Sequence, residues 1–160
     1  MVSICVLCVG KLKEKFYTDA CAEYVKRLGA FCRLEIVELP EARRSASPAP
    51  AETAAALKKE GDALLSRIPK GAYVIPLCIE GTQQDSPSFA RLLQQGAIAG
   101  GGRLCFIIGG SDGLDSRVKA SGAVRISMSK MTFPHHLARI MLLEQIYRGF
   151  QIAAGGKYHK

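Results

Sequence analysis

Two kinds of hydrophobic pattern open the chain. Residues 2–9, VSICVLCV, are apolar almost throughout, which is typical of a strand buried on both faces of a sheet. Residues 32–39, CRLEIVEL, alternate apolar and polar side chains, as a strand with one solvated face does. Between them apolar residues recur every four positions and stop before Gly29, which predicts a helix of about thirteen residues. These residues are Phe16, Ala20, Tyr24 and Leu28.

The remaining pattern alternates strands with helices. Apolar strands are predicted at 72–79, 103–108 and 123–127. Helices are predicted at 52–67, 86–98, 114–120 and 135–152. Residues 40–50 are rich in proline and serine, which indicates a mobile loop. This order favours an α/β fold with a mostly parallel sheet and helices on both faces.

The chain carries no sign of division or of membrane insertion. It has 160 residues without a linker or repeat, so a single domain over 1–160 is expected. No apolar run approaches the roughly 18 residues that cross a bilayer. The N-terminus has its apolar run before its basic cluster, the reverse of a secretory signal. We therefore expect a cytoplasmic protein with reduced thiols, in which Cys5 and Cys8 point to opposite faces of a strand.

The charge favours a polyanionic partner. Twenty-two Lys and Arg residues against fourteen Asp and Glu residues give a formal charge of +8. Such an excess suits contacts with nucleic-acid phosphates, although a basic protein without such a partner would show it too. The basic residues cluster at Lys11/Lys13/Lys15, Arg43/Arg44, Lys58/Lys59 and the C-terminal tail.

Three predicted strands end in unusual sequence: LCIEG at 77–81, IGGSDG at 108–113, and the loop from 126 to 134. Ligands of open parallel sheets bind beyond the carboxyl ends of the strands. Glycine there allows a ligand to lie close against the main chain, and tight turns use glycine as well. These segments predict a backbone-lined pocket for a flat ligand.

GGSDG also matches G-x-S-x-G, the nucleophile elbow of serine hydrolases. Ser111 would then need Asp115 and a histidine from among residues 135, 136 and 159. The chain is short for that class, and Asp115 lies very close to the serine in sequence, so this interpretation is disfavoured. Neither a Walker phosphate loop nor a G-x-G-x-x-G nucleotide pattern follows the first strand.

The last third of the chain resembles one family closely. LCIEG, IIGGSDGL, ISMSKMTFPHHLARIMLLEQIYRGF and the terminal YHK are similar to the pseudouridine N3-methyltransferases of the large ribosomal subunit, which belong to the SPOUT class. The similarity extends to VGKLKEKFY near the start and so covers essentially the whole chain. It rests most heavily on SKMTFPH and on the tail.

The resemblance implies a fold that periodicity cannot reveal, an α/β domain with a deep C-terminal trefoil knot. It also implies that the knotted loops bind S-adenosylmethionine. Carried over by position, the cofactor-binding residues are Leu77, Gly109, Met128, Ser129, Lys130, Met131, Thr132 and Phe133.

The resemblance further implies a homodimer with the last helix near its interface. The substrate would be pseudouridine 1915 of 23S rRNA within the assembled 70S ribosome. An apolar stripe on the last helix is compatible with an interface, and burial within one chain is the alternative. The stripe comprises Leu137, Ile140, Met141, Leu143, Ile146, Tyr147 and Phe150.

Methylation at N3 requires loss of the imide proton, so a base or stabilising cations should lie near the methyl group. The candidates are His159, Tyr158, His135, Arg139 and Arg148. His135 could instead cap the helix, and the arginines could be solvated or bind phosphate. Tyr158 and His159 are expected to stack on and hydrogen-bond the target base. No metal is expected, because ligand spacing is absent and sulfonium chemistry needs none.

A different class of function also fits the charge and size. A non-catalytic ribosome-binding or assembly protein could keep the fold without the chemistry. Such a protein would have no need of S-adenosylmethionine, so cofactor binding discriminates between the two interpretations.

Overall fold

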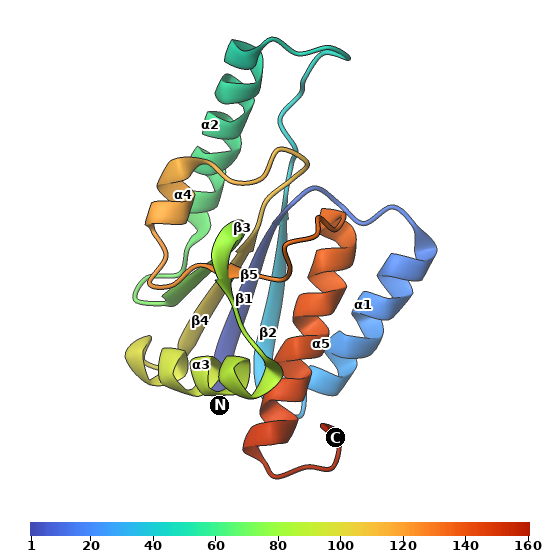
Figure 1. The fold of residues 1–160 in the computed structure, drawn as a ribbon, viewed down its shortest axis with the longest axis vertical. Helices are drawn as coiled ribbons and strands as arrows, with labels where there is room; N and C mark the ends of the chain where they lie inside the picture. Colours follow the sequence, from blue (N-terminus) through green and yellow to red (C-terminus); the bar gives the residue numbers. More distant parts are fainter.

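The centre of the protein is one five-stranded parallel sheet, seen in a computed structural model that describes all residues 1–160 (Figure 1). The strands are β1 (Val2–Val9), β2 (Cys32–Leu39), β3 (Tyr73–Gln83), β4 (Arg103–Ile108) and β5 (Ile126–Ser127). Their order in the sheet is β2-β1-β4-β3-β5, and every pairing is parallel. The predicted α/β class and parallel sheet are confirmed.

Helices cover both faces of this sheet. They are α1 (Lys15–Leu28), α2 (Pro50–Arg67), α3 (Ser86–Ala99), α4 (Ser116–Ala120) and α5 (His135–Ala153). Helices α1, α3 and α5 pack on one face, where Leu28, Leu93 and Ile146 join one core cluster. Helices α2 and α4 pack on the other, where Leu64 and Val118 join a second cluster. Most of these helices begin and end within two residues of the positions that the sequence predicts.

Strand β1 contributes side chains to both core clusters, one on each face of the sheet. Its residues from Ile4 to Val9 are all buried, as its continuous apolar run predicts. Cys8 belongs to the core under α1, α3 and α5, whereas Cys5 belongs to the core under α2 and α4. The two thiols thus point to opposite faces of the sheet, as predicted, and both are free.

One position in α1 departs from its predicted pattern. Phe16 was expected on the buried stripe of this helix, but its side chain is 65% exposed. It lies in the first turn of α1, beyond the edge of the core, and its ring contacts Tyr17 at 4.3 Å between centroids. Helical periodicity identifies a face, but it does not show where along the helix that face leaves the core.

The edge of the sheet formed by β3 and β5 differs most from the prediction. Strand β3 continues to Gln83 instead of ending at 79, and β5 contains only Ile126 and Ser127 of the predicted 123–127. Ile126 pairs with both Leu77 and Thr82, so β3 bends where it meets β5 and the register shifts between these two residues. A Cβ atom on Gly81 would lie 2.5 Å from the Ile126 carbonyl carbon, so glycine is required at this crossing.

The chain between β2 and α2 has no regular secondary structure, as predicted, but Arg44 does not face solvent. Its side chain is only 11% exposed and forms ion pairs with Glu60 and Asp112. Of the basic pair Arg43/Arg44, Arg44 is therefore already paired with distant carboxylates. Arg43 is exposed.

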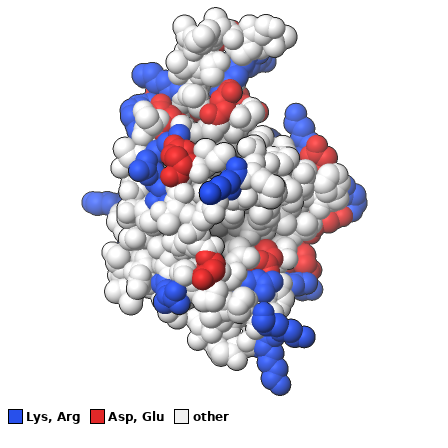
Figure 2. Space-filling view, viewed as in Figure 1, with Lys and Arg blue, Asp and Glu red and all other residues white.

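The charged side chains on one face of the molecule do not single out a nucleic-acid site. Figure 2 shows Lys and Arg side chains spread over this face without forming one continuous patch. No helix combines the length and the apolar character that a membrane span needs.

Candidate functional site

Three neighbouring strand ends and the start of α5 enclose a cavity of about 740 Å³. Strands β4, β3 and β5 are adjacent in the sheet, so their carboxyl ends meet at one edge. The lining residues come from 77–80, 108–114, 127–129 and 131–135, with Lys119 and Ala138. The sequence placed a ligand pocket at this edge, and the structure forms a cavity there.

A glycine turn forms one wall of this cavity. The Gly113 N–H donates to the Gly110 carbonyl oxygen at 3.1 Å, and Gly113 has a φ of +78° that disfavours other residues. A Cβ atom on Gly109 would lie 2.3 Å from the Gly113 carbonyl oxygen. The turn therefore presents bare main chain to the cavity, which suits a flat ligand.

The same turn excludes the serine hydrolase interpretation. The Ser111 hydroxyl donates to Glu41 Oε1 at 2.8 Å, and no histidine is among its hydrogen-bond partners. Asp115, the acid that the triad would need, instead accepts from the N–H and side chain of Arg117 at the start of α4. Neither residue is arranged for nucleophilic catalysis.

The opposite wall is the irregular loop after β5. Two short hydrogen bonds shape it: the Ser127 hydroxyl donates to the Ser129 carbonyl oxygen at 3.0 Å, and Ser129 Oγ accepts from the Met131 N–H at 3.0 Å. Met131 is 71% exposed at the rim of the cavity. A large apolar side chain in that position can cover a bound ligand.

Most of the residues predicted to bind the cofactor lie together here. Leu77, Gly109, Met128, Ser129, Met131, Thr132 and Phe133 line the cavity. Lys130 does not line it and points to solvent, although it lies between two residues that do. The sequence prediction missed the ion pair between Lys119 Nζ and Glu80 Oε1, at 2.5 Å, which joins α4 to the end of β3 beside the cavity.

His135, at the first position of α5, also lines this cavity. Burial lowers the pKa of its imidazole, and the neighbouring His136 and Arg139 lower it further against an opposing effect of Glu41. The imidazole is therefore mainly neutral at pH 7 and can accept a proton. His136 packs beside it, with ring centroids 4.1 Å apart.

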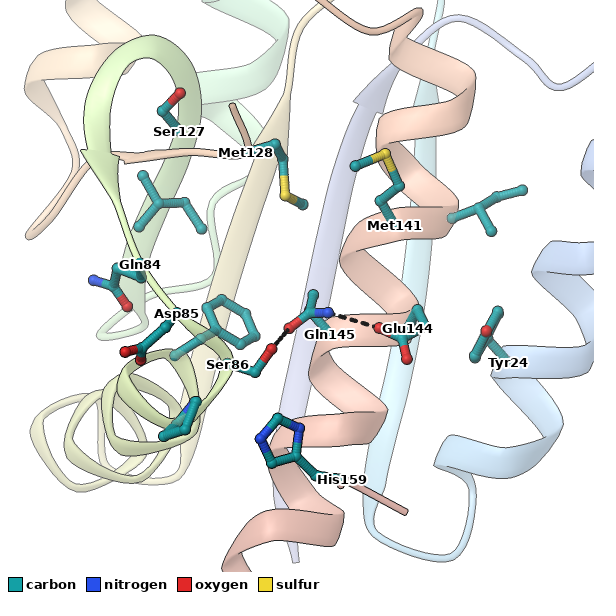
Figure 3. A pocket seen from close by; sticks show the side chains of 14 residues that line it. Tyr24, Gln84, Asp85, Ser86, Ser127, Met128, Met141, Glu144, Gln145 and His159 are labelled. Atoms are coloured by element: carbon teal, nitrogen blue, oxygen red, sulfur yellow. Dashed lines mark hydrogen bonds between the residues drawn. The ribbon is translucent and has the colours of Figure 1, made fainter. Parts of the chain in front are cut away.

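A second cavity, of about 790 Å³, lies between α5, α1 and the β3–α3 connection. Ser127 and Met128 line both cavities and so form the partition between them. Figure 3 shows Gln145 in this second cavity between Ser86 and Glu144. The Ser86 hydroxyl donates to Gln145 Oε1 at 2.9 Å, and Gln145 Nε2 donates to Glu144 at 2.7 Å.

The C-terminal tail folds back onto α5. The Tyr158 hydroxyl donates to Glu144 Oε1 at 3.2 Å, and its ring packs under the Arg148 guanidinium at 4.6 Å. Burial, followed by Glu144, raises the Tyr158 pKa, so the phenol stays protonated at neutral pH. His159 lines the second cavity, with its Nδ1 3.5 Å from Arg148 Nη1. The tail is thus anchored, but it does not line the first cavity.

Both arginines among the catalytic candidates, Arg139 and Arg148, are already paired with carboxylates. Arg148 Nη2 lies 2.6 Å from Glu144 Oε1, and the guanidinium packs over the Tyr158 ring, so Arg148 contacts both α5 and the tail. Arg139 is 3% exposed, and its guanidinium donates to Glu38 Oε2 at 2.8 Å and to the Gly10 carbonyl oxygen at 3.1 Å. The expectation of a solvated Arg139 on the polar side of the helix is wrong, because α5 buries that side against the ends of β1 and β2.

Replacement of Arg139 by methionine is expected to lower the free energy of unfolding by about 2 kcal/mol, since Glu38 loses its buried partner but stays partly solvated. Burial raises the Glu38 pKa, but the hydrogen bonds from Arg139 and the Leu12 N–H outweigh burial and leave it lowered. Because the Glu38 pKa is lower in the folded state, its ionised form stabilises the folded protein at pH values above the ordinary glutamate pKa. This stabilisation is lost as the pH falls through the pKa of Glu38 in the folded protein. The difference between wild type and Arg139→Met should therefore shrink on acidification.

Urea denaturation at pH 7 and at pH 3 to 4 checks this expectation. Lys15→Met is the matched control, because Lys15 and Asp19 form a pair on α1 that is 87% and 61% exposed. Its effect should stay within about 0.5 kcal/mol. Equal effects of the two substitutions would contradict a structural role for Arg139.

The apolar stripe predicted on α5 is largely used within the chain. Leu143 and Ile146 are buried in the core, and Ile140, Tyr147 and Phe150 pack against it. Met141 lines the second cavity. Burial within one chain therefore accounts for most of the stripe, as the alternative interpretation held.

Known proteins similar to this chain match it over nearly its whole length, and their names describe methyltransferases. The family model described as "Predicted SPOUT methyltransferase" matches residues 2–159. A protein named ribosomal RNA large subunit methyltransferase H from Pelotomaculum thermopropionicum is 43% identical over 159 residues, which cover 99% of each chain. The protein of the same name from Streptococcus thermophilus is 45% identical over 155 residues, covering 97% of this chain and 98% of that one.

Solved structures show the same fold at low sequence identity. The tRNA (m1G37) methyltransferase from Aquifex aeolicus aligns with a TM-score of 0.55 and 15% identity, over 92% of this chain and 69% of that one. A probable methylase family protein from Haemophilus influenzae aligns with a TM-score of 0.53 and 12% identity, over 98% of this chain and 70% of that one.

Proposed function

The chain belongs to the SPOUT methyltransferase family, and from this we propose that it methylates N3 of pseudouridine 1915 in 23S rRNA, within the assembled 70S ribosome. The relatives that are 43–45% identical over nearly their whole length carry the name of a large-subunit rRNA methyltransferase. The single structural observation that supports the proposal is the cavity at the ends of β3, β4 and β5, lined by seven of the eight predicted cofactor residues.

The methyl donor of this family is S-adenosylmethionine, and the cavity fits it chemically. Bare main chain at Gly109 and Gly113 can approach a planar adenine, and the Leu77, Met131 and Phe133 side chains can enclose it. Lys119 and Glu80 provide charges of both signs for an amino acid group. The sulfonium group makes the methyl group electrophilic, so the protein needs mainly to align the acceptor.

We assign removal of the N3 proton to a histidine. His135 lines the cofactor cavity and is mainly neutral at pH 7, so its imidazole can accept the proton. His159 and Tyr158 are assigned to the target base, through stacking and hydrogen bonds. Arg139 is not assigned to catalysis, because its side chain is 3% exposed and is paired with Glu38.

A homodimer would bring these groups together. In one chain His159 lines the second cavity, whereas seven of the eight predicted cofactor residues line the first. Ser127 and Met128 line both cavities and separate them. We propose that substrate binds across two subunits, so that the tail of one chain completes the site of the other. Residues 1–160 would act as one methyltransferase domain, with the chain threaded as a trefoil knot where Ile126 crosses the bend of β3.

The exposed Lys11 and Lys13 are candidates for RNA phosphate contacts. Both follow Gly10 at the end of β1, and a Cβ atom on Gly10 would lie 3.5 Å from His135 Nε2. This places the lysine-containing loop beside the start of α5 and the cofactor cavity. Neither lysine takes part in an ion pair, so both charges are available to a polyanion.

The proposal is tested by methyl transfer from labelled S-adenosylmethionine to unmethylated 70S ribosomes and to free large subunits, followed by mapping of the labelled nucleotide. We expect label at N3 of pseudouridine 1915, with assembled ribosomes strongly preferred. The control is Gly109→Arg, which fills the turn beside Gly113 and should abolish transfer. Cofactor binding without label in either particle would contradict the proposed substrate.

A further inference from the structure

Arg44 lies outside both cavities, yet distant carboxylates hold its side chain in one place. Arg44 Nη2 donates to Glu60 Oε1 on α2 at 3.0 Å, and Nη1 donates to the Ala42 carbonyl oxygen at 2.7 Å. Its Nε lies 2.6 Å from Asp112 Oδ2, an ion pair without the alignment of a hydrogen bond. The guanidinium therefore connects α2 to the glycine turn after β4.

A second contact, between Glu41 and Ser111, also joins the loop between β2 and α2 to the glycine turn. The Ser111 hydroxyl donates to Glu41 Oε1 at 2.8 Å, three residues before Arg44 in the same loop. Ser111 and Asp112 both line the cofactor cavity, whereas Glu41 and Arg44 do not. The loop between β2 and α2 thus contacts the turn from outside the cavity.

Helix α4, which follows the glycine turn, is also bound to α2. Arg117 Nη1 donates to Asp62 Oδ1 on α2 at 2.7 Å, and Arg117 Nη2 lies 2.9 Å from Asp115 Oδ2. A Cβ atom on Gly61 would lie 2.7 Å from Asp115 Cβ, so α2 touches the start of α4 directly. Helix α2 is therefore linked to the turn at Asp112 through Arg44, and it contacts the start of α4 directly.

A turn with glycines at 109, 110 and 113 has little stiffness of its own, and ordering it on ligand binding would cost conformational entropy. External ties that order it beforehand raise affinity for the ligand. We propose that Arg44 is a positioning residue for the cofactor cavity, which holds the turn at 110–113 against α2 in its binding conformation. This inference rests on the proposed use of S-adenosylmethionine.

Stability must be separated from positioning in any test of Arg44. The Glu60 side chain is 3% exposed, and its Oε2 has no hydrogen-bond partner, so it depends on the Arg44 charge. Arg44→Met alone would leave a buried unpaired carboxylate. The double variant Arg44→Met/Glu60→Gln removes that charge while the contact to Asp112 remains absent.

The test measures the dissociation constant of S-adenosylmethionine by calorimetry, together with thermal unfolding. We expect about tenfold weaker binding in both Arg44→Met and the double variant, with the melting temperature recovered in the double variant. Hydrogen exchange of the unliganded protein should be faster at 110–114 in both variants. Arg43→Met, a change in the exposed neighbour, should leave cofactor affinity and exchange unchanged.

Recovery of both affinity and melting temperature in the double variant would overturn the inference, because Arg44 would then act on stability alone. Unchanged cofactor affinity with weaker ribosome binding would overturn it in favour of an RNA contact. Failure of the proposed function can be told apart from failure of this inference. If the wild-type protein binds the cofactor but does not methylate 23S rRNA, the cofactor affinities of the variants can still be compared. Wild type that binds no cofactor would overturn both proposals.

Discussion

Truncation after Gly156 is expected to lower methyl transfer to the ribosome by about 10²-fold or more, because the deleted Tyr158 and His159 are assigned to the target base. The affinity for S-adenosylmethionine should change by less than about twofold. The reason is that His159 lines the second cavity and not the first, where seven of the eight predicted cofactor residues lie. Single-turnover methylation and calorimetric cofactor binding measure the two effects separately.

Two variants refine this result. Removal of Lys160 alone should have no effect, because that residue is exposed and makes no side-chain hydrogen bond or ion pair. Tyr158→Phe keeps the ring against Tyr147 and Arg148 but loses the hydrogen bond to Glu144, so it should reduce activity less than truncation does. Wild-type activity in the truncated protein would remove the tail from the catalytic site.

Gly81→Ala is expected to lower the free energy of unfolding by about 3 kcal/mol and to weaken cofactor binding at least tenfold. The new Cβ atom would lie 2.5 Å from the Ile126 carbonyl carbon and 2.7 Å from its oxygen. Ile126 cannot move away freely, because β3 pairs with it at Leu77 and again at Thr82. The strain should reach the cavity, since residues 77–80 form part of its wall.

Urea denaturation at one fixed protein concentration measures the stability change, and calorimetry measures the change in cofactor affinity. Gly101→Ala is the matched control. No heavy atom lies within 4 Å of its Cβ position, but its φ is +57°, so it should cost about 1 kcal/mol through backbone strain alone. Gly101 precedes β4 at the opposite end of the sheet, so cofactor affinity should not change. Equal stabilities of Gly81→Ala and wild type would mean that the crossing is not tight.

Local patterns were sufficient for much of the fold. Burial of β1 on both faces follows from eight consecutive positions, and α1 follows from a four-residue repeat with Gly29 after it. The cavity at the ends of β3, β4 and β5 was predictable for a related reason: the carboxyl ends of parallel strands meet at one edge, so residues 77–81 and 108–113 had to converge. The assignment of individual residues to S-adenosylmethionine came only from the family resemblance.

The sequence by itself thus determined the elements of this protein, its sheet class and the edge that carries the cavity, because hydrophobic periodicity and strand-end chemistry act over a few neighbouring residues. Only the tertiary structure decided which charged side chains are buried and which carboxylates they pair with. Arg139 is neutralised by Glu38, 101 positions away, and Arg44 by Glu60 and Asp112. The bend of β3 around Ile126 and the return of Tyr158 to Glu144 are likewise long-range contacts. Whether an arginine is buried or solvated depends on partners that only folding brings to it, and no local pattern contains that information.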